Sequence, residues 1–482
     1  MKKILFLILT LIVSLALVGC NGGTSKGGSI ADENYNVETV ENLKAQEFGS
    51  VKVSFRIPFG QNIQAIIQEF IDEFETEYPS VDIELDVVSG YDKCKDATVN
   101  DIGGGKVPTM TVGYPDHFSE FLISKSIISL DKFIYDANVG YSEDELADFL
   151  PDYITENRQF DNKGTFVGLP FNKSTEALFY NKEFFETFAD QGIYVPTTWE
   201  ELEEVCAKIM EIVPTIKNGD YYWLGDIETN LANGNFVPCL IDSGGNLFTT
   251  IIHQFGGEYT ESIYKSNGLV DIQRGNIKFH TSAKAYEALE YLQGLANKGY
   301  INMPDVMELN YGSDGFNEGK AVMNIGSTAG SSYYAESICT TGAALLPYKA
   351  SEGNKAVIQQ GTNVCIFSKS SDLEKLAAWL FIKYMLEPEN TIRLAAPTGY
   401  MPIRQSAYDL PQYKAFLNGI TLQARVHEAT TQYAEKGWTF FVDAAWAGSA
   451  TVRNECETAM IQMLLNKTDI SQALQDALGR IG

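Results

Sequence analysis

The sequence VKVSFRIPFGQNIQAIIQEFIDEFETEYPSVDIELDV spans residues 51–87 and predicts the fold class. Its first and last seven residues alternate apolar and polar side chains, which indicates strands over 51–57 and 81–87. Residues 62–77 instead carry apolar side chains at helical spacing, and Tyr78 and Pro79 stop this helix. The spaced apolar residues are Ile63, Ile66, Ile67, Phe70, Ile71 and Phe74. Strand, helix and strand within about 40 residues form a βαβ unit, so we expect an α/β lobe with a largely parallel sheet.

The same two periodicities continue along the chain. Strand character recurs over 109–112, 166–171, 177–181 and 319–326, and long helical patterns cover 283–298 and 373–386. A second lobe opens near Thr198, which can cap a helix while Glu201 closes a capping box. We expect the chain to make its first crossover between two lobes within 166–181.

Composition narrows the class of protein. The formal net charge is −27, and it becomes −29 if a leader carrying Lys2 and Lys3 is removed. Such a surface repels nucleic acid and anionic lipid, and it also keeps an exported protein in solution. About 460 residues remain after the leader, which is too many for one core and enough for two large lobes. No apolar stretch after Cys20 is long enough to span a bilayer.

The N-terminus has the pattern of a secretory signal. Lys2 and Lys3 precede an apolar run over 4–18, and the segment ends in Leu-Val-Gly-Cys at Cys20. This ending resembles the bacterial lipobox, in which the cysteine is diacylated and the signal is cut before it. The Gly/Ser-rich stretch 21–29 is typical of a flexible tether. We therefore expect a lipoprotein on the outer face of a cell membrane, extracellular or periplasmic; the alternative is a plain signal peptide that contains a cysteine.

The other cysteines do not indicate a metal site. They are scattered without a CxxC pair, and a chain of this size does not need a disulfide framework. They are Cys94, Cys206, Cys239, Cys339, Cys365 and Cys456. Free buried thiols and one or more disulfides both remain open.

Signals of catalysis are weak. The chain has no HExxH or P-loop motif, GxSxG is matched only at 23–27 inside the Gly/Ser-rich stretch, and the four histidines lack ligand spacing. Two of its 63 acidic residues could serve a glycosidase, but this signal is unspecific. We expect a binding protein without cofactor or metal; a secreted glycan hydrolase and an adhesin without a small ligand are the alternatives.

Polar and aromatic side chains at predicted strand ends and loops are the candidate ligand-binding residues. Ligands of α/β proteins bind at the carboxyl ends of strands, and two facing lobes form a cleft there. The candidates are Tyr91, Asp116, Ser174, Ser327, Gly361, Tyr400 and Arg453.

Five segments carry a resemblance to a known family. They are 168–175 (GLPFNKST), 178–185 (LFYNKEFF), 196–202 (PTTWEEL), 316–323 (FNEGKAVM) and 388–390 (PEN). The chain from about residue 51 onward resembles the extracellular solute-binding proteins of ABC importers, in the carbohydrate cluster. Segments 170–175, 398–403 and 452–453 look most like its sn-glycerol-3-phosphate-binding branch. The resemblance implies a two-lobed, periplasmic-binding-protein-like α/β fold whose hinge strands let the lobes close on a ligand.

The resemblance also implies ligand contacts for these candidates. The glutamate that contacts the glycerol hydroxyls in that branch aligns with Pro115 of this chain. Either Asp116 replaces this carboxylate after a shift of one residue, or the hydroxyl end of the ligand differs. The tryptophan pair of that branch has no clean match, because Tyr222 and Trp223 lie in a divergent region. If the ligand carries a phosphate, Arg453 would supply a charged fork, and the hydroxyls of Ser174, Ser327 and Tyr400 would donate hydrogen bonds to it. Gly361 would let a backbone N–H approach the phosphate closely. For a neutral sugar, Tyr91, Trp223 and Asp116 could stack and accept hydrogen bonds.

We therefore expect a monomeric substrate-binding subunit of an ABC importer. It would capture glycerol 3-phosphate or a glycerophosphodiester, with a neutral mono- or oligosaccharide as the alternative ligand. It would deliver the solute to permease subunits, while a lipid holds it at the membrane. The expected divisions are a signal peptide (1–19), a lipidated flexible tether (20–48), lobe 1 (49–165), a hinge (166–181), lobe 2 (182–325) and returning segments that contribute to both lobes and the cleft (326–482).

Overall fold

The predicted βαβ unit forms the edge of the first sheet in the computed structural model, which describes residues 30–481. Strands β1 (Val51–Ile57) and β2 (Val81–Val87) are parallel and in register, from Val51 opposite Val81 to Ile57 opposite Val87. Helix α2 (Gln61–Glu77) connects them and buries Ile67, Phe70, Ile71 and Phe74. The expected apolar stripe therefore faces the sheet, as burial of its side chains requires.

Lobe 1 is built on five strands in the order β2-β1-β3-β13-β4. The new strands are β3 (Met110–Gly113), β4 (Leu169–Ser174) and β13 (Gln360–Ile366). β3 is parallel to β1, but β13 is antiparallel to both of its neighbours. The prediction of a largely parallel sheet was therefore wrong for two of the four strand pairings, because β13 returns from late in the chain and inserts against the direction of the other four strands.

Helices cover both faces of this sheet and carry side chains to its edge. They are α3 (Tyr91–Gly104), α4 (Pro115–Ile123), α5 (Asp131–Ile134), α6 (Glu143–Ala147), α7 (Pro151–Glu156), α14 (Asp372–Met385) and α15 (Pro388–Ala395). α14 begins and ends within one residue of its prediction.

Lobe 2 has its own five-stranded sheet in the order β11-β5-β10-β6-β9. Its strands are β5 (Glu176–Asn181), β6 (Cys239–Ile241), β9 (Ile301–Asn302), β10 (Met323–Ser327) and β11 (Thr341–Ala344). The capping box of Thr198 and Glu201 is present at the start of α9. The helices are α8 (Lys182–Thr187), α9 (Trp199–Ile212), α10 (Ile227–Ala232), α11 (Gly244–Gln254), α12 (Ala283–Asn297), α13 (Gly312–Asn317), α17 (Leu422–Glu435), α18 (Ser449–Leu465) and α19 (Ile470–Ile481). Helix α16 (Pro411–Leu417) packs both on α17 and on α15 of lobe 1.

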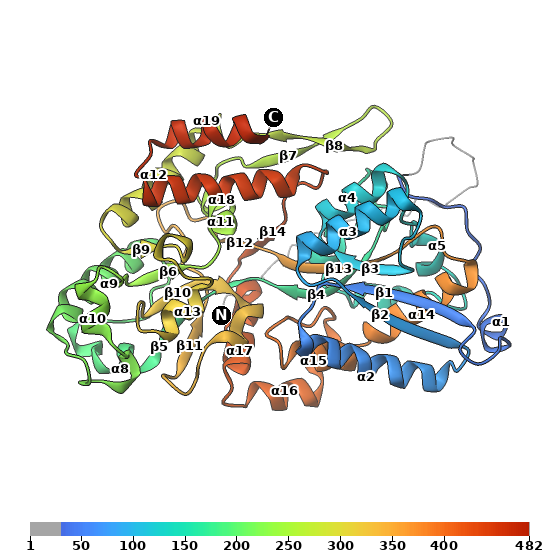
Figure 1. Ribbon diagram of the computed structural model, residues 1–482, viewed down its shortest axis with the longest axis horizontal. Coiled ribbons are helices and arrows are strands. Elements are labelled where there is room, and N and C mark those ends of the chain that lie inside the picture. Colours follow the sequence, from blue (N-terminus) through green and yellow to red (C-terminus); the bar gives the residue numbers. More distant parts are fainter. Residues whose placement is uncertain (1–29, 482) are drawn as a thin grey trace, which may run out of the picture.

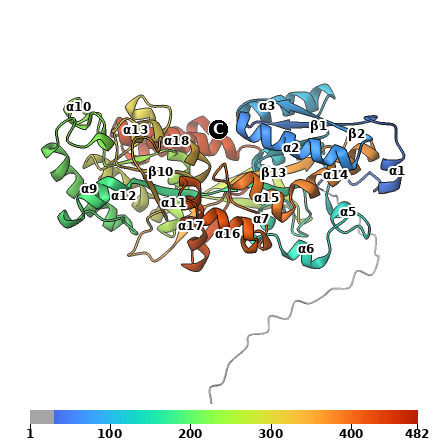
Figure 2. The same cartoon turned by 90° about the horizontal axis from the view of Figure 1, so that it is seen from below.

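The two lobes lie side by side along the long axis of the molecule (Figures 1 and 2). A single residue, Thr175, separates β4 of one sheet from β5 of the other, and its hydroxyl donates to the carbonyl of Ile358 at 2.8 Å. Strand β12 (Ala356–Ile358), which ends at this carbonyl, pairs in parallel with β14 (Thr439–Phe441), and the chain then enters lobe 1 as β13. The lobes are thus joined by short extended segments next to one another.

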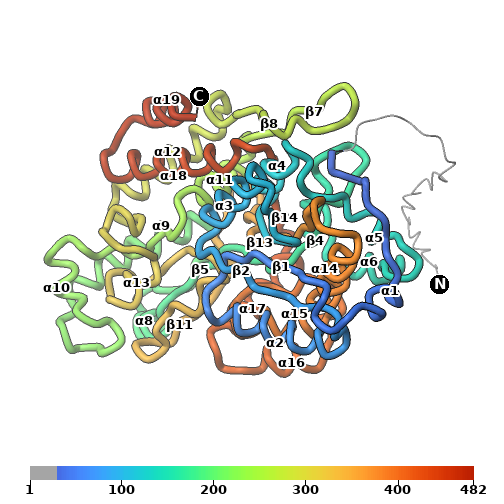
Figure 3. Tube along the Cα trace, turned by 45° about the vertical axis from the view of Figure 1, so that its right-hand side comes forward, coloured from blue at the N-terminus to red at the C-terminus, as the bar shows by residue number. Residues whose placement is uncertain are grey.

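One hairpin of lobe 2 reaches lobe 1. Strands β7 (Thr260–Tyr264) and β8 (Val270–Ile277) form a two-stranded sheet that packs against α4 (Figures 1 and 3). The Val270 amide donates to the Phe160 carbonyl at 3.0 Å, and the Asn162 amide donates to the Gly268 carbonyl at 2.9 Å. The predicted boundary of lobe 2 thus includes a segment whose contacts lie in the other lobe.

The packed body begins earlier than the sequence predicted. Residues 30–48 were expected to be tether, but Tyr35 and Leu43 are buried in the core of lobe 1 and α1 (Val40–Lys44) packs against α14. The Tyr35 hydroxyl also donates to the Ser129 carbonyl at 2.6 Å. Hydrophobic burial holds this segment, so the prediction that residues 30–48 belong to the tether was wrong. Cys20 and the predicted signal lie outside the described residues.

Truncating Leu43 to alanine is expected to lower the free energy of unfolding by about 2 kcal/mol or more, because a fully buried leucine leaves a cavity. Phe48 belongs to the same segment but is 89% exposed, so Phe48→Ala is a matched control with an expected change below about 0.5 kcal/mol. Urea unfolding of both variants measures the difference. Equal stability of the two would mean that residues 30–48 are a loose tether in solution.

Two further observations concern membrane-spanning helices and the state of the cysteines. Across residues 30–481, no helix is both long and apolar enough to cross a membrane. The six cysteines after Cys20 are all buried and free, so of the two open alternatives the structure shows thiols.

Candidate functional site

A polar cleft lies between the two lobes and consists of two adjoining cavities. The first has a volume of about 230 Å³ and the second about 320 Å³, and Tyr114 and Gln360 line both. The walls come from α3, α4 and α7 of lobe 1 and from α11, α13 and α18 of lobe 2. A molecule in the cleft would therefore touch both lobes.

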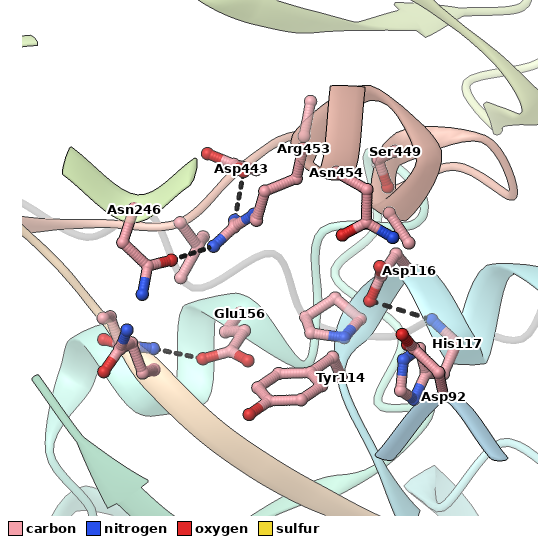
Figure 4. Close-up of a pocket in the computed structure, with 16 residues that line it drawn as sticks. Asp92, Tyr114, Asp116, His117, Glu156, Asn246, Asp443, Ser449, Arg453 and Asn454 are labelled. Atoms are coloured by element: carbon pink, nitrogen blue, oxygen red, sulfur yellow. Dashed lines mark hydrogen bonds and ion pairs between the residues drawn. The ribbon is translucent and has the colours of Figure 1, made fainter. Parts of the chain in front are cut away.

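Arg453, on the first turns of α18, is the one arginine or lysine that lines the described cleft. One guanidinium nitrogen donates to Asn246 Oδ1 at 2.8 Å, and another forms an ion pair with Asp443. Figure 4 shows these three residues on one side of the first cavity, with Tyr114 and Asp116 on the other. Burial alone would lower the pKa of Arg453, but attraction to Asp443 raises it above its usual value. The guanidinium stays charged.

Carboxylates outnumber this cation. The acidic residues lining the two cavities are Asp92, Asp116, Glu156, Asp242 and Asp443. Glu156 is buried and accepts hydrogen bonds from Lys173 at 2.9 Å and Asn363 at 2.8 Å. Among the described residues, neither Asp92 nor Asp116 forms an ion pair, so their charges are available to a ligand.

Tyrosines dominate the second cavity. Its aromatic lining is Tyr91, Tyr114, Tyr311, Tyr333, Tyr334 and Tyr400. The hydroxyls of Tyr91 and Tyr400 lie 3.0 Å apart and share a hydrogen bond. Tyr311 and Tyr333 stack with ring centroids 5.8 Å apart and planes 3° from parallel, and both remain more than half exposed. These rings offer flat faces and hydroxyls to a polar solute.

The structure brings together six of the seven residues predicted from the sequence. Asp116 and Arg453 line the first cavity, and Tyr91, Ser174, Ser327 and Tyr400 line the second. Gly361 lines neither, although it follows Gln360, which lines both. Its backbone has φ +95°, and an added Cβ would lie 1.9 Å from the Asn172 carbonyl oxygen. Close packing of β13 on β4 thus requires a glycine there.

Trp223, considered above for sugar stacking, is not in the cleft. It is buried in lobe 2, where its ring packs against Phe184 and Tyr221. Neither cavity of the cleft is lined by it, and a divergent stretch of sequence could not reveal this position.

Several lining residues were missed. Tyr114 directly follows β3, so its position at a strand end was a usable signal. No usable signal in the sequence marked the other three missed residues. Asn246 reaches the cleft from the start of α11, Asp443 from a loop, and Gln360 from the start of the returning strand β13. Within residues 30–481, no group of three or more His, Cys, Asp and Glu side chains is arranged to hold a metal ion.

Glu176 lies buried behind the cleft at the start of β5. Its pKa is raised from 4.5 to about 8, mainly by burial and to a smaller extent by Asp242 and Glu457, while Asn246 and Arg453 oppose the shift. Its Oε2 atom has no hydrogen-bond partner among the described residues. A neutral, protonated Glu176 at pH 7 fits this setting.

The contribution of Glu176 to stability is expected to fall as pH rises from about 5 to about 8. In this window the folded state keeps the Glu176 proton and the unfolded state releases it, so the unfolded state gains by roughly 1.4 kcal/mol per pH unit. Burial lowers the pKa of His427 to about 4, which acts in the opposite direction up to its ordinary value of 6.5, so the net stability is expected to fall above about pH 6.5. Glu176→Gln mimics the protonated form and is expected to flatten this slope, while the exposed Glu211→Gln is expected to leave it unchanged. Urea unfolding at several pH values measures it, and an unchanged slope in Glu176→Gln would contradict the burial argument.

Two α/β lobes joined by short extended segments, with a polar cleft lined from both sides, define the class of two-lobed ligand-binding proteins. Residues 69–417 match the family of bacterial extracellular solute-binding proteins, and the chain belongs to this family.

Relatives and solved structures agree with this placement. The sn-glycerol-3-phosphate-binding periplasmic protein UgpB of Yersinia pestis is 23% identical over 372 residues, which cover 75% of this chain and 76% of that protein. UgpB of Escherichia coli K12 is 22% identical over 379 residues, 76% and 78% of the two chains. Mycobacterium tuberculosis UgpB in complex with glycerophosphocholine has a TM-score of 0.67 at 19% identity, covering 90% of this chain and 98% of that one. The cyclic alpha-maltosyl-1,6-maltose binding protein of Arthrobacter globiformis has a TM-score of 0.66 at the same identity and coverage.

Proposed function

We propose that this chain is the substrate-binding subunit of an ABC importer, which captures a small hydroxylated solute in the cleft and delivers it to membrane permease subunits without chemical change. The observation that carries the proposal is the cleft itself, whose lining comes from both lobes. A ligand that touches both lobes favours the closed arrangement, and a permease can recognise that arrangement.

A neutral mono- or oligosaccharide is the ligand class that the lining favours. Asp92 and Asp116, which form no ion pair among the described residues, can accept hydrogen bonds from sugar hydroxyls, and the exposed rings of Tyr311 and Tyr333 can stack on a sugar face. Arg453 is already paired with Asp443, and no other lysine or arginine among residues 30–481 lines the two cavities, so an anion would find no unpaired cation there. Ser174 and Ser327 add hydroxyls that donate or accept.

A phosphorylated glycerol or glycerophosphodiester is the second candidate. Arg453 presents a guanidinium fork in the first cavity, and such a fork binds phosphate in two-pronged fashion. The UgpB relatives are named for binding glycerol 3-phosphate, so phosphorylated ligands are included in the binding screen below.

The anchor is part of the proposal. We propose that Cys20 carries the lipid, that residues 21–29 are the tether, and that the monomer stands on the outer face of the membrane. The support is that Ile30 and Ala31 are buried against lobe 1, so the tether would enter the body there. Mass spectrometry of the mature N-terminus tests it, since a Cys20→Ala variant would lose the lipid and the membrane association.

A thermal-shift screen of residues 30–482 tests the function. The probes are neutral mono- and oligosaccharides, glycerol 3-phosphate and glycerophosphocholine. At a ligand concentration about 100-fold above Kd, binding adds about 2.7 kcal/mol and raises Tm by several degrees. A shift with sugars alone supports the first class, and a shift with phosphorylated compounds alone supports the second. The absence of any shift, or the appearance of cleaved glycan, would contradict the proposal.

A further inference from the structure

Asp443 occupies the position at Arg453 that an anionic ligand would need. It follows β14 in the loop before α18, and its Oδ2 atom accepts from the Arg453 guanidinium. Asn246 Oδ1 accepts from the other terminal nitrogen at 2.8 Å. Both terminal nitrogens of the fork are thus engaged by the protein's own acceptors.

We infer that Asp443 is the specificity-determining residue of the cleft: it acts as a built-in anion on Arg453, so that the cleft accepts neutral hydroxylated solutes and rejects phosphorylated ones. This inference deepens the proposed function and rests on it for the location of the ligand. A phosphate could engage Arg453 only after displacing Asp443, whose side chain is 10% exposed and whose Oδ1 atom is buried without a partner among the described residues.

The other charges that line the cleft also disfavour a phosphorylated ligand. Asp116 lines the same cavity and Asp242 the adjoining one, while the charge of Glu156 is balanced by Lys173 at 2.9 Å. With Asp443 neutralising Arg453, the described cleft presents net negative charge to its ligand. An incoming phosphate would meet like charges, which reject a ligand more effectively than a missing contact does.

Removing the Asp443 charge should reverse this preference. In Asp443→Asn the amide keeps the shape of the side chain, and Arg453 gains an uncompensated positive charge inside the cleft. We expect the affinity for glycerol 3-phosphate and inorganic phosphate, measured by isothermal titration calorimetry at fixed ionic strength, to rise at least about tenfold over the wild-type protein.

Asp92→Asn is the matched control. Asp92 lines the same cavity and carries the same charge, but it makes no ion pair with Arg453 among the described contacts. We expect its phosphate affinity to rise less than about threefold, as screening of a more distant charge allows. An equal gain in both variants would overturn the inference, since it would show only a general effect of net charge.

The wild-type protein also tests the inference without any variant, which covers the case that Asp443→Asn does not fold. Saturable wild-type binding of glycerol 3-phosphate in the micromolar range, with neutral sugars ineffective, would overturn it while leaving the importer function intact. Failure of the wild-type protein to bind any solute would instead refute the proposed function. In that case a phosphate gain confined to Asp443→Asn would still support the role of Asp443.

Discussion

Replacing Lys173 with methionine is expected to lower the free energy of unfolding by about 3 to 5 kcal/mol. Lys173 is fully buried at the end of β4, and its ammonium lies 2.9 Å from Glu156, which is itself 3% exposed. Methionine keeps most of the volume but removes the charge, so Glu156 would remain as an uncompensated buried carboxylate. Burial lowers the pKa of Lys173, and attraction to Glu156 opposes this effect.

A double variant separates charge from packing. Lys173→Met with Glu156→Gln removes both charges, and we expect it to recover most of the lost stability, because a buried pair as a whole contributes little. Lys208→Met is the surface control: Lys208 and Glu211 also form an ion pair at 2.7 Å, but both are largely exposed, and the expected cost is below about 1 kcal/mol. Urea unfolding measures all three. A loss below about 1 kcal/mol in Lys173→Met would contradict a buried, charged pair.

The position of this pair makes the experiment relevant to function. Lys173 lies two residues before Thr175, where the chain passes from one sheet to the other, and Glu156 lines the first cavity. A stable double variant is therefore suited to asking whether the buried pair affects ligand affinity as well as stability.

Replacing Gly361 with alanine is expected to cost more than about 3 kcal/mol of stability. The new Cβ would lie 1.9 Å from the Asn172 carbonyl oxygen and 2.7 Å from the Lys173 Cα, so the backbones of β13 and β4 would have to separate. A non-glycine residue at φ +95° adds strain of about 1 to 3 kcal/mol. Because both strands lead into the segments that join the lobes, we also expect weaker ligand binding in any folded fraction.

Gly353→Ala is the control for backbone strain alone. Gly353 has φ +73°, but an added Cβ would meet no atom within 4 Å, so only about 1 to 2 kcal/mol is expected. Thermal and urea unfolding compare the two variants. If Gly361→Ala cost no more than Gly353→Ala, the close approach of β13 to β4 would be refuted.

Short-range patterns made much of the fold predictable. The apolar spacing of α2, the alternation of β1 and β2, and the Thr198 capping box depend on residues within one turn or one strand, and each occurs as expected. The candidate residues Tyr91, Ser174 and Tyr400 were chosen for their places at predicted strand ends and loops and supported by the resemblance to a family, and they line one cavity.

The sequence by itself determined the α/β class, the main helices and strands and the family, because periodicity and capping act between neighbouring residues. Only the tertiary structure decided that β13 inserts antiparallel, that residues 30–48 join the core, and that Arg453 meets Asn246 and Asp443. Asn246 and Arg453 are 207 positions apart, and no local pattern encodes such a contact. The balance of charge in the cleft follows from such long-range pairings, since a charge acts on a ligand only after folding has determined which opposite charge lies beside it.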